Sequence, residues 1–182
     1  MEGFTLWFTG LSGAGKSTIA DILAKEFHTR GRDVEVLDGD VIRTNLSKGL
    51  GFSKEDRDTN IRRIGWVCKV LSRNKVVAIA AAISPYEDIR EEVRSSMKNF
   101  IEVYAKCSID VLTERDVKGL YKKALAGEIK NFTGISDPYE EPQNPEVTFD
   151  SGKETVEESA QKILSYLEKR GLIPANPVGS SA

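Results

Sequence analysis

Short apolar runs alternate with longer amphipathic segments along the whole chain. The run at residues 76–83 has no polar alternation, which is typical of a strand that is buried on both faces. The longer segments carry apolar residues at helical spacing. Alternating strands and helices predict an α/β fold with a single doubly wound parallel sheet. The predicted strands are residues 4–9, 34–37, 76–83, 100–107 and 147–150, and the predicted helices include 18–27, 53–73 and 155–169.

The stretch GLSGAGKS at residues 10–17 matches the phosphate-loop pattern and lies between a strand and a helix, as the pattern requires. Glycines let the backbone curl, so that its N–H groups and the positive end of the helix surround a phosphate chain. Lys16 would contact the β and γ phosphates of ATP, and the Ser17 hydroxyl would hold Mg2+. The alternative is a Gly-rich turn that binds nothing. The predicted nucleotide-binding residues here are Gly10, Leu11, Ser12, Gly13, Ala14, Gly15, Lys16, Ser17 and Thr18.

Polar residues also follow two other predicted strands. In parallel sheets, ligands bind beyond the carboxyl ends of the strands, where the phosphate loop also falls. Asp38 and Asp40 follow the second strand and could supply a general base for an attacking hydroxyl and an outer-shell group for Mg2+. The alternative is a plain turn, since Asp and Gly favour turns. Ser84 follows the third strand and precedes Pro85, so it is expected to cap the next helix whether or not it also contacts a ligand.

Two further polar segments leave a functional and a structural interpretation open. Arg57 and Asn60 are three residues apart near the start of the predicted helix at 53–73, so they share a face. They form a polar clamp or belong to a charged amphipathic helix without function. The segment 118–132 is a mobile lid that closes over phosphates or a solvated basic helix. Its lysines are Lys118, Lys122, Lys123 and Lys130.

Length and composition narrow the class of protein. The 182 residues suffice for one well-filled domain. A net charge of -2 gives no general attraction to nucleic acid or to an anionic membrane, and we expect neither as a partner. No signal segment or membrane-spanning run is recognised. Cys68 and Cys107 lack CxxC spacing, which favours a reducing cytoplasm over a disulfide framework or a zinc site. Trp7 and Trp66 are expected in the core.

Taken together, these blocks resemble the adenosine 5'-phosphosulfate (APS) kinase family over residues 6–172. The phosphate loop alone is common to many kinases and ATPases, so the resemblance rests on the order of the other blocks. They are LDGDVIR at 37–43, LGFS at 50–53, DRDTNIRR at 56–63, ISP at 83–85, RDVKGLYKKA at 115–124, GEIKNFTGI at 127–135 and DPYE at 137–140. The resemblance implies a three-layer sandwich of the P-loop nucleotide-kinase type with a helical lid. The kinase domain would then span residues 1–173 with the lid at about 115–142, and residues 174–182 would form a flexible tail.

The resemblance also implies that the chain transfers the ATP γ-phosphoryl group to the 3'-hydroxyl of APS. The products would be 3'-phosphoadenosine 5'-phosphosulfate (PAPS) and ADP, in sulfate assimilation. Phosphoryl transfer depends mainly on alignment and charge neutralisation, so Lys16, Mg2+ and Lys118 would carry most of the effect. Asp40 is the first choice, and Asp38 the second, for orienting or deprotonating the 3'-hydroxyl. Arg115 resembles the arginine that packs on the ATP adenine in related small-molecule kinases.

The same resemblance assigns the acceptor site. It places Phe52 and Phe132 on the two faces of the APS adenine, where stacking contributes about 1–3 kcal/mol per base. Ser84 matches the position described in the family as a phosphoserine intermediate. We expect a hydrogen bond to APS instead, because direct in-line transfer needs no covalent intermediate and no obvious base adjoins Ser84 in sequence. The remaining predicted APS contacts are Asp40, Arg43, Arg57, Asn60, Ile83, Lys118 and Asn131.

Three departures from the family pattern stand out. Leu125 replaces the usual Arg of the lid and removes one cation, Val41 replaces the usual Asn, and the N-terminal arm of several members is not expected. The resemblance suggests a homodimer, with ATP sulfurylase as a separate partner or as a fused domain. The rival interpretations are another phosphate-loop kinase, acting on a nucleoside monophosphate or a sugar acid, and a non-catalytic nucleotide-binding module that docks on ATP sulfurylase.

Overall fold

The computed structural model describes residues 1–176, except for the side chain of Asp40. Most of the predicted tail at 174–182 therefore lies outside the described residues. Five parallel strands form one sheet in the order β2-β3-β1-β4-β5, which confirms the predicted fold class. The strands are β1 (Phe4–Thr9), β2 (Val34–Asp38), β3 (Val77–Ala81), β4 (Phe100–Lys106) and β5 (Val147–Asp150). The helices are α1 (Lys16–Thr29), α2 (Gly39–Asn45), α3 (Lys54–Arg73), α4 (Glu87–Ser95), α5 (Ile109–Arg115), α6 (Leu120–Leu125) and α7 (Val156–Lys169).

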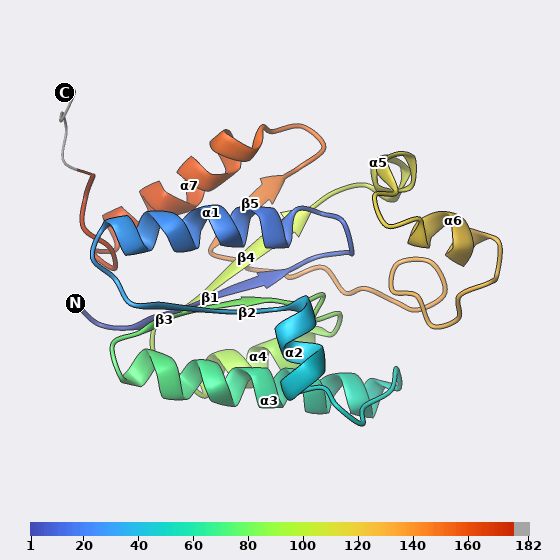
Figure 1. Cartoon of the computed structure of the whole chain (residues 1–182), viewed down its shortest axis with the longest axis horizontal. Coiled ribbons are helices and arrows are strands. Elements are labelled where there is room, and N and C mark those ends of the chain that lie inside the picture. The colour runs from blue at the N-terminus through green and yellow to red at the C-terminus, as the bar shows by residue number, and fades with distance from the viewer. Residues whose placement is uncertain (177–182) are drawn as a thin grey trace.

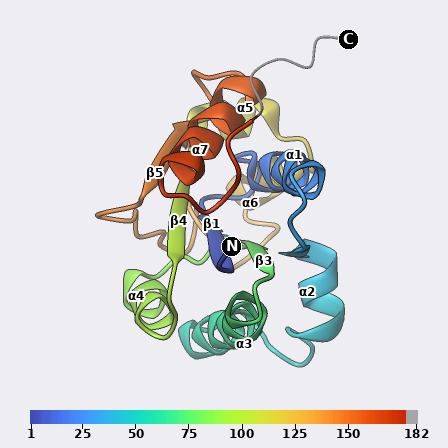
Figure 2. The same cartoon turned by 90° about the vertical axis from the view of Figure 1, so that its left-hand side faces the viewer.

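Helices cover both faces of the sheet (Figures 1 and 2). α1 and α7 lie on one face and α3 and α4 on the other, while α5 and α6 lie beyond the carboxyl ends of the strands. Side chains of β1 alternate between the two faces. Phe4, Leu6 and Phe8 belong to the core cluster with α1 and α7, whereas Trp7 belongs to the cluster with α3 and α4. Because both faces are covered, a ligand can reach the sheet only at its edges.

Polar caps fix the starts of the two longest segments that the sequence predicted as helices. At α3, the Ser53 hydroxyl accepts a hydrogen bond from the Asp56 N–H at 3.1 Å, as expected. At α7, Thr155 and Glu158 form a reciprocal capping box. Both helices therefore begin at the positions that local sequence favours.

The prediction that Ser84 caps the next helix was wrong, because the N-cap of α4 is Tyr86, which makes no side-chain cap hydrogen bond. Asp38, for which a plain turn was the alternative, caps the short helix α2, since its carboxylate accepts the Gly39 N–H at 2.6 Å. The segment from residue 109 onward forms two helices, α5 and α6, and the chain bends between them. Asp116 and Gly119 have φ values of 27° and 67°, and this left-handed geometry interrupts the helical path.

The two tryptophans have opposite environments. Trp7 is fully buried, as predicted, but Trp66 is 66% exposed on the outer side of α3, so its core assignment was wrong. An aromatic residue at helical spacing can face outward as well as inward, and the sequence does not separate the two. None of the helices within residues 1–176 combines the length and apolarity that a membrane span requires.

Candidate active site

The phosphate loop joins the end of β1 to the start of α1. Gly10 passes so close to β4 that a Cβ atom there would lie 2.5 Å from the Ala105 carbonyl oxygen. Gly13 and Gly15 have φ values of 81° and 97°, which glycine adopts without steric cost. α1 begins at Lys16, so its unpaired N–H groups and the positive end of its dipole face the loop. The loop therefore has the backbone shape that a phosphate chain needs.

Lys16 is buried and lies against the loop. Its Nζ atom donates to the carbonyl oxygens of Gly10 at 2.7 Å and Leu11 at 2.9 Å. Burial lowers the pKa of Lys16 to about 7, the nearby Asp38 opposes this shift, and the positive charge of Lys118 adds to it. The charges of Asp38, at the end of β2, and of Lys118 thus act on Lys16 in the phosphate loop.

The acceptor side is assembled from α3 and the segment that follows α6. The two terminal nitrogens of Arg57 donate to the Thr133 hydroxyl at 3.1 Å and to the Asn131 carbonyl at 2.7 Å. Arg57 also forms an ion pair with Asp137 at 2.8 Å. One side chain of α3 therefore holds both ends of the short segment that carries Phe132.

Two other predicted acceptor residues are exposed at the surface. Arg43 is exposed on α2, and Phe52, just before α3, is 69% exposed. Asn60 does not share a partner with Arg57, because its Oδ1 atom accepts the Ser47 hydroxyl at 2.5 Å. Arg57 and Asn60 therefore bind different neighbours and do not form the polar clamp that their helical spacing left open.

Ser84 is only 1% exposed and has a left-handed φ of 48°, an uncommon conformation for a residue other than glycine. Its hydroxyl accepts the Trp7 Nε1–H at 3.0 Å. Its carbonyl accepts hydrogen bonds from the Thr9 hydroxyl at 3.3 Å and from the Arg90 guanidinium. The preceding Ile83 carbonyl accepts the Thr9 hydroxyl at 2.7 Å. These contacts fix the Ser84 backbone and leave its hydroxyl enclosed.

Arg115 ends α5 and reaches the loop between β5 and α7. It donates to the Ser151 hydroxyl at 3.3 Å and to the Ser151 carbonyl at 2.5 Å. Ser151 borders the phosphate loop, since a Cβ atom on Gly15 would lie 3.7 Å from the Ser151 Cβ. Arg115 therefore lies beside the phosphate loop.

Two tyrosines for which the sequence predicted no role connect the lid to the rest of the site. The Tyr139 hydroxyl is 2.9 Å from the Thr9 hydroxyl, and its ring stacks on Tyr104 with centroids 6.2 Å apart. The Tyr121 hydroxyl donates to the Ser12 carbonyl at 2.5 Å. Both tyrosines lie in blocks that carried the family resemblance. That position was the only feature of the sequence that could have indicated a role for them.

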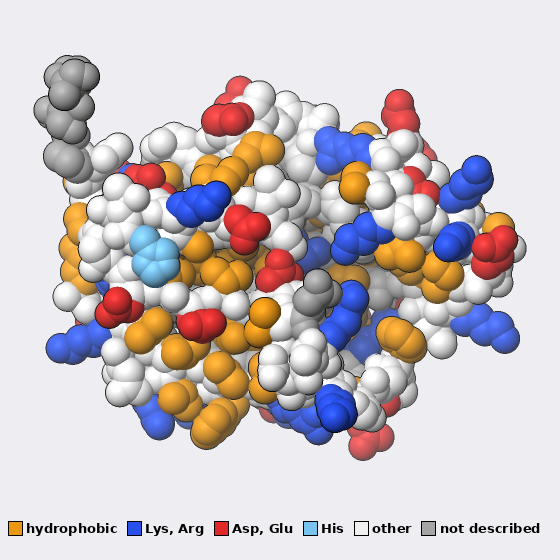
Figure 3. All heavy atoms as spheres, viewed as in Figure 1, with side chains coloured by type: hydrophobic (Ala, Val, Ile, Leu, Met, Phe, Trp, Pro, Cys, Tyr) orange, Lys and Arg blue, Asp and Glu red, His pale blue; other side chains and the backbone are white. Residues whose placement is uncertain are grey.

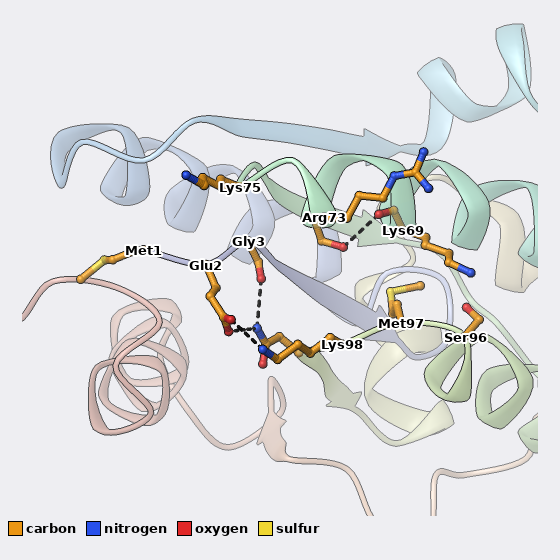
Figure 4. A pocket seen from close by; sticks show the side chains of 11 residues that line it. Met1, Glu2, Gly3, Lys69, Arg73, Lys75, Ser96, Met97 and Lys98 are labelled. Carbon is orange, nitrogen blue, oxygen red and sulfur yellow. Dashed lines mark hydrogen bonds and ion pairs between the residues drawn. The ribbon is translucent and has the colours of Figure 1, made fainter.

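Two hollows mark the surface at opposite ends of the sheet. One, of about 510 Å3, is lined by Leu11, Tyr104 and part of the segment 134–141, and its charged lining residues, Asp137 and Glu141, are acidic. Figure 3 shows Lys and Arg side chains gathered on the right-hand part of the molecule. The other, of about 580 Å3, lies at the amino ends of the strands. In Figure 4 the cationic ends of Lys69, Lys75 and Lys98 point in different directions. We therefore place the site at the carboxyl ends, where ligands of parallel sheets bind.

Comparisons with known proteins agree with this geometry. The family model described as adenylylsulphate kinase matches residues 2–150. A protein of Rippkaea orientalis described as adenylyl-sulfate kinase is 59% identical, over 97% of this chain and 97% of its own length. A Sorangium cellulosum protein described as a probable bifunctional SAT/APS kinase 2 is 66% identical over 96% of this chain, which spans 30% of that longer protein.

A solved structure is similar over nearly the whole fold. The Mycobacterium tuberculosis APS kinase CysC, solved in complex with AMPPNP and APS, is 39% identical with a TM-score of 0.86, and the match covers 92% of this chain and 98% of that one. The family match therefore extends over both the phosphate loop and the acceptor side. The chain belongs to the adenylylsulphate kinase family of P-loop kinases, which transfer phosphate from ATP to APS.

Proposed function

We propose that the chain transfers the γ-phosphoryl group of ATP to the 3'-hydroxyl of APS, with PAPS and ADP as products. The observation that carries this proposal is the phosphate loop, with Gly13 and Gly15 in the left-handed region and the buried Lys16 at the start of α1, in a chain of the adenylylsulphate kinase family. Asp38 and Lys118 are close enough to Lys16 to affect its pKa. These residues come from the nucleotide side, the end of β2 and the lid. A cationic environment at that point is what the charge of a transferring phosphoryl group needs.

On the nucleotide side, the N–H groups of the loop and Lys16 hold the β and γ phosphates. Mg2+ fits this site, because the Ser17 hydroxyl is an oxygen ligand of the kind that the ion prefers and the Asp38 carboxylate would act as an outer-shell group. Within the described residues, no group of three or more His, Cys, Asp or Glu could hold a metal alone. Phosphate oxygens would therefore complete the coordination, and the ion would neutralise developing charge on them. Arg115 packs on the ATP adenine.

On the acceptor side, Phe52 and Phe132 stack on the APS adenine, and Asp40 orients or deprotonates the 3'-hydroxyl. The backbone of Asp40 belongs to α2, while its side chain lies outside the described atoms. Ser84 acts by holding the pocket wall and not as a phosphoserine, because its hydroxyl is enclosed and bonded to Trp7. The other proposed APS contacts are Arg43, Arg57, Asn60, Ile83, Lys118 and Asn131.

The direct test is transfer of γ-labelled phosphate from ATP to a panel of acceptors. We expect labelled product with APS, and turnover with AMP, gluconate or shikimate at least about a hundredfold lower, because those acceptors lack the sulfate or the base. Equal or better turnover with another acceptor would contradict the proposal. Binding of ATP and APS without any product would favour a regulatory nucleotide-binding module instead.

We further propose a homodimer, and ATP sulfurylase as a partner or fused domain. The first is supported by the family resemblance, and the exposed Trp66 on α3 is a candidate contact. The second is supported by the bifunctional name of the Sorangium relative. Light scattering should give about twice the monomer mass of 20.1 kDa, and Trp66→Ser should shift the mass toward one monomer. A wild-type monomer at micromolar concentration would contradict the dimer.

A further inference from the structure

Tyr121 is the side chain that joins the two halves of the proposed site. It lies on α6 and is 3% exposed. Its backbone N–H donates to Asp116 Oδ1 at 2.9 Å, and the next N–H, of Lys122, donates to Oδ2 at 3.0 Å. The carboxylate of Asp116 therefore caps α6 and fixes the position from which the tyrosine ring extends.

The hydroxyl of Tyr121 contacts the nucleotide side. It donates to the Ser12 carbonyl at 2.5 Å, and burial raises its pKa to about 12, so it remains a proton donor at physiological pH. Ser12 is followed by Gly13, and the peptide unit between them is planar with its C=O and N–H pointing in opposite directions. Fixing the Ser12 carbonyl thus also fixes the direction of the Gly13 N–H, one of the loop groups that bind phosphate.

The ring of Tyr121 contacts the acceptor side. It meets Phe132 edge to face, with ring centroids 5.0 Å apart and an interplanar angle of 81°. This arrangement is the favoured geometry for an aromatic pair. Phe132 is half-buried, so the tyrosine supports the ring proposed to stack on the acceptor base. A change in the orientation of the Ser12–Gly13 peptide unit can therefore shift the Phe132 ring through the Tyr121 side chain.

We propose that Tyr121 is a positioning residue that couples nucleotide binding at the phosphate loop to acceptor binding at Phe132. Because the inference rests on the proposed function, it concerns ATP analogues and APS. A phosphate chain that orients the Gly13 N–H also sets the Ser12 carbonyl, the Tyr121 hydroxyl and, through the ring, the Phe132 face. The affinity for APS then depends on whether the nucleotide is present, and the reverse dependence has the same size.

The test is the dissociation constant of APS measured by calorimetry with and without saturating AMPPNP. The ratio of the two constants is the coupling factor. In the wild-type protein we expect a factor of at least about five. Tyr121→Phe keeps the ring and removes the hydroxyl, and we expect the factor to fall about fivefold, while the affinity for each ligand alone changes less than about twofold.

Tyr166→Phe is the matched control. The Tyr166 hydroxyl also has one hydrogen-bond partner, Arg170 at 2.8 Å, but lies on α7 away from the lid. This variant should keep the wild-type coupling factor. Tyr121→Leu additionally removes the ring edge, and it should weaken APS binding even without nucleotide.

Three outcomes overturn the inference. One is a wild-type coupling factor of one, and another is an unchanged factor in Tyr121→Phe. The third is that Tyr121→Phe binds both AMPPNP and APS more weakly while the coupling factor stays unchanged, which is what a purely structural tyrosine would give. Labelled transfer to APS is measured separately on the wild-type protein. Successful transfer without coupling therefore contradicts the inference alone, whereas an absence of APS binding contradicts the proposed function as well.

Discussion

The nucleotide side and the acceptor side of the site are built in different ways. The nucleotide side is one continuous stretch, residues 10–18, whose conformation follows from its own glycines and from the start of α1. The acceptor side depends on contacts between distant segments, such as Arg57 with Asn131 and Trp7 with Ser84, which are 74 and 77 residues apart. A local motif therefore indicates that ATP binds, whereas the proposed acceptor site depends on tertiary structure. Substitutions on the two sides should separate these roles.

The largest effect is expected on the nucleotide side. Lys16→Met removes the cation that faces the phosphates and should lower kcat at least about a thousandfold with any acceptor. Steady-state transfer of labelled phosphate measures this loss. Lys25→Met, at an exposed position of α1, is the control and should keep wild-type activity. A loss smaller than tenfold for Lys16→Met would exclude the proposed role of this lysine.

Asp40→Ala should affect the reaction more than binding. We expect kcat to fall about a hundredfold, because a positioned base contributes about that much, while the ATP dissociation constant stays within about twofold. Kinetics and calorimetry on the same preparation compare the two quantities. Asp33→Ala, at the amino end of β2, is the control. Unchanged turnover in Asp40→Ala would remove Asp40 from the mechanism.

Phe132→Ala tests the acceptor side alone. Loss of one stacking face should raise the APS dissociation constant about tenfold and leave ATP binding unchanged. Phe52→Ala should have an effect of similar size if the two rings enclose the same base. An APS affinity that does not change in either variant contradicts the aromatic sandwich.

Asp137→Asn tests the contact that holds the Phe132 segment to α3. The Arg57 and Asp137 side chains are 12% and 21% exposed, so their ion pair is partly shielded from water. We expect the KM for APS to rise about fivefold with little change for ATP. Glu92→Gln breaks the more exposed pair with Arg62, in which each side chain is 52% exposed, and should leave both KM values unchanged. Equal effects of the two variants would show that the segment is held by other contacts.

The smallest effect is a proton taken up when nucleotide binds. The pKa of Lys16 is lowered from 10.5 to about 7, so the lysine is mostly neutral at pH 8, and the negative phosphates favour its charged form. Calorimetry in buffers of different ionisation enthalpy should show uptake of close to one proton at pH 8 and almost none at pH 6. Uptake should disappear in Lys16→Met. Equal uptake at both pH values would contradict the assigned protonation of Lys16.

The same shift predicts how stability changes with pH. Between pH 7 and 10.5 the unfolded chain binds more protons at Lys16 than the folded protein does. The free energy of unfolding should therefore increase as pH rises through this window. In Lys16→Met this increase should be absent.

Much of the fold followed from local sequence. The five strands were apolar runs, and Ser53 is the type of residue that caps helices, so neither needed distant contacts to be recognised. The phosphate loop was complete in one segment. Asp38 and Asp40 could be placed at the carboxyl ends of the strands because parallel strands end together.

The remaining features depend on contacts that local patterns do not encode. The left-handed backbone of Ser84 is stabilised by Trp7, Thr9 and Arg90, which lie on other elements. The outward direction of Trp66 depends on which face of α3 meets the sheet. The bond between Tyr121 and Ser12 spans 109 residues, so no local pattern predicts it.

We propose that the triphosphate of ATP and the sulfated nucleotide meet at the carboxyl end of this sheet. A crystal structure of this chain with both AMPPNP and APS would show the positions of the two ligands. We expect the 3'-oxygen of APS at about 3–3.5 Å from the γ-phosphorus, with the APS adenine between Phe52 and Phe132. An APS sugar bound well away from that phosphorus, with residues 115–142 in contact with the phosphate loop, would contradict the claim.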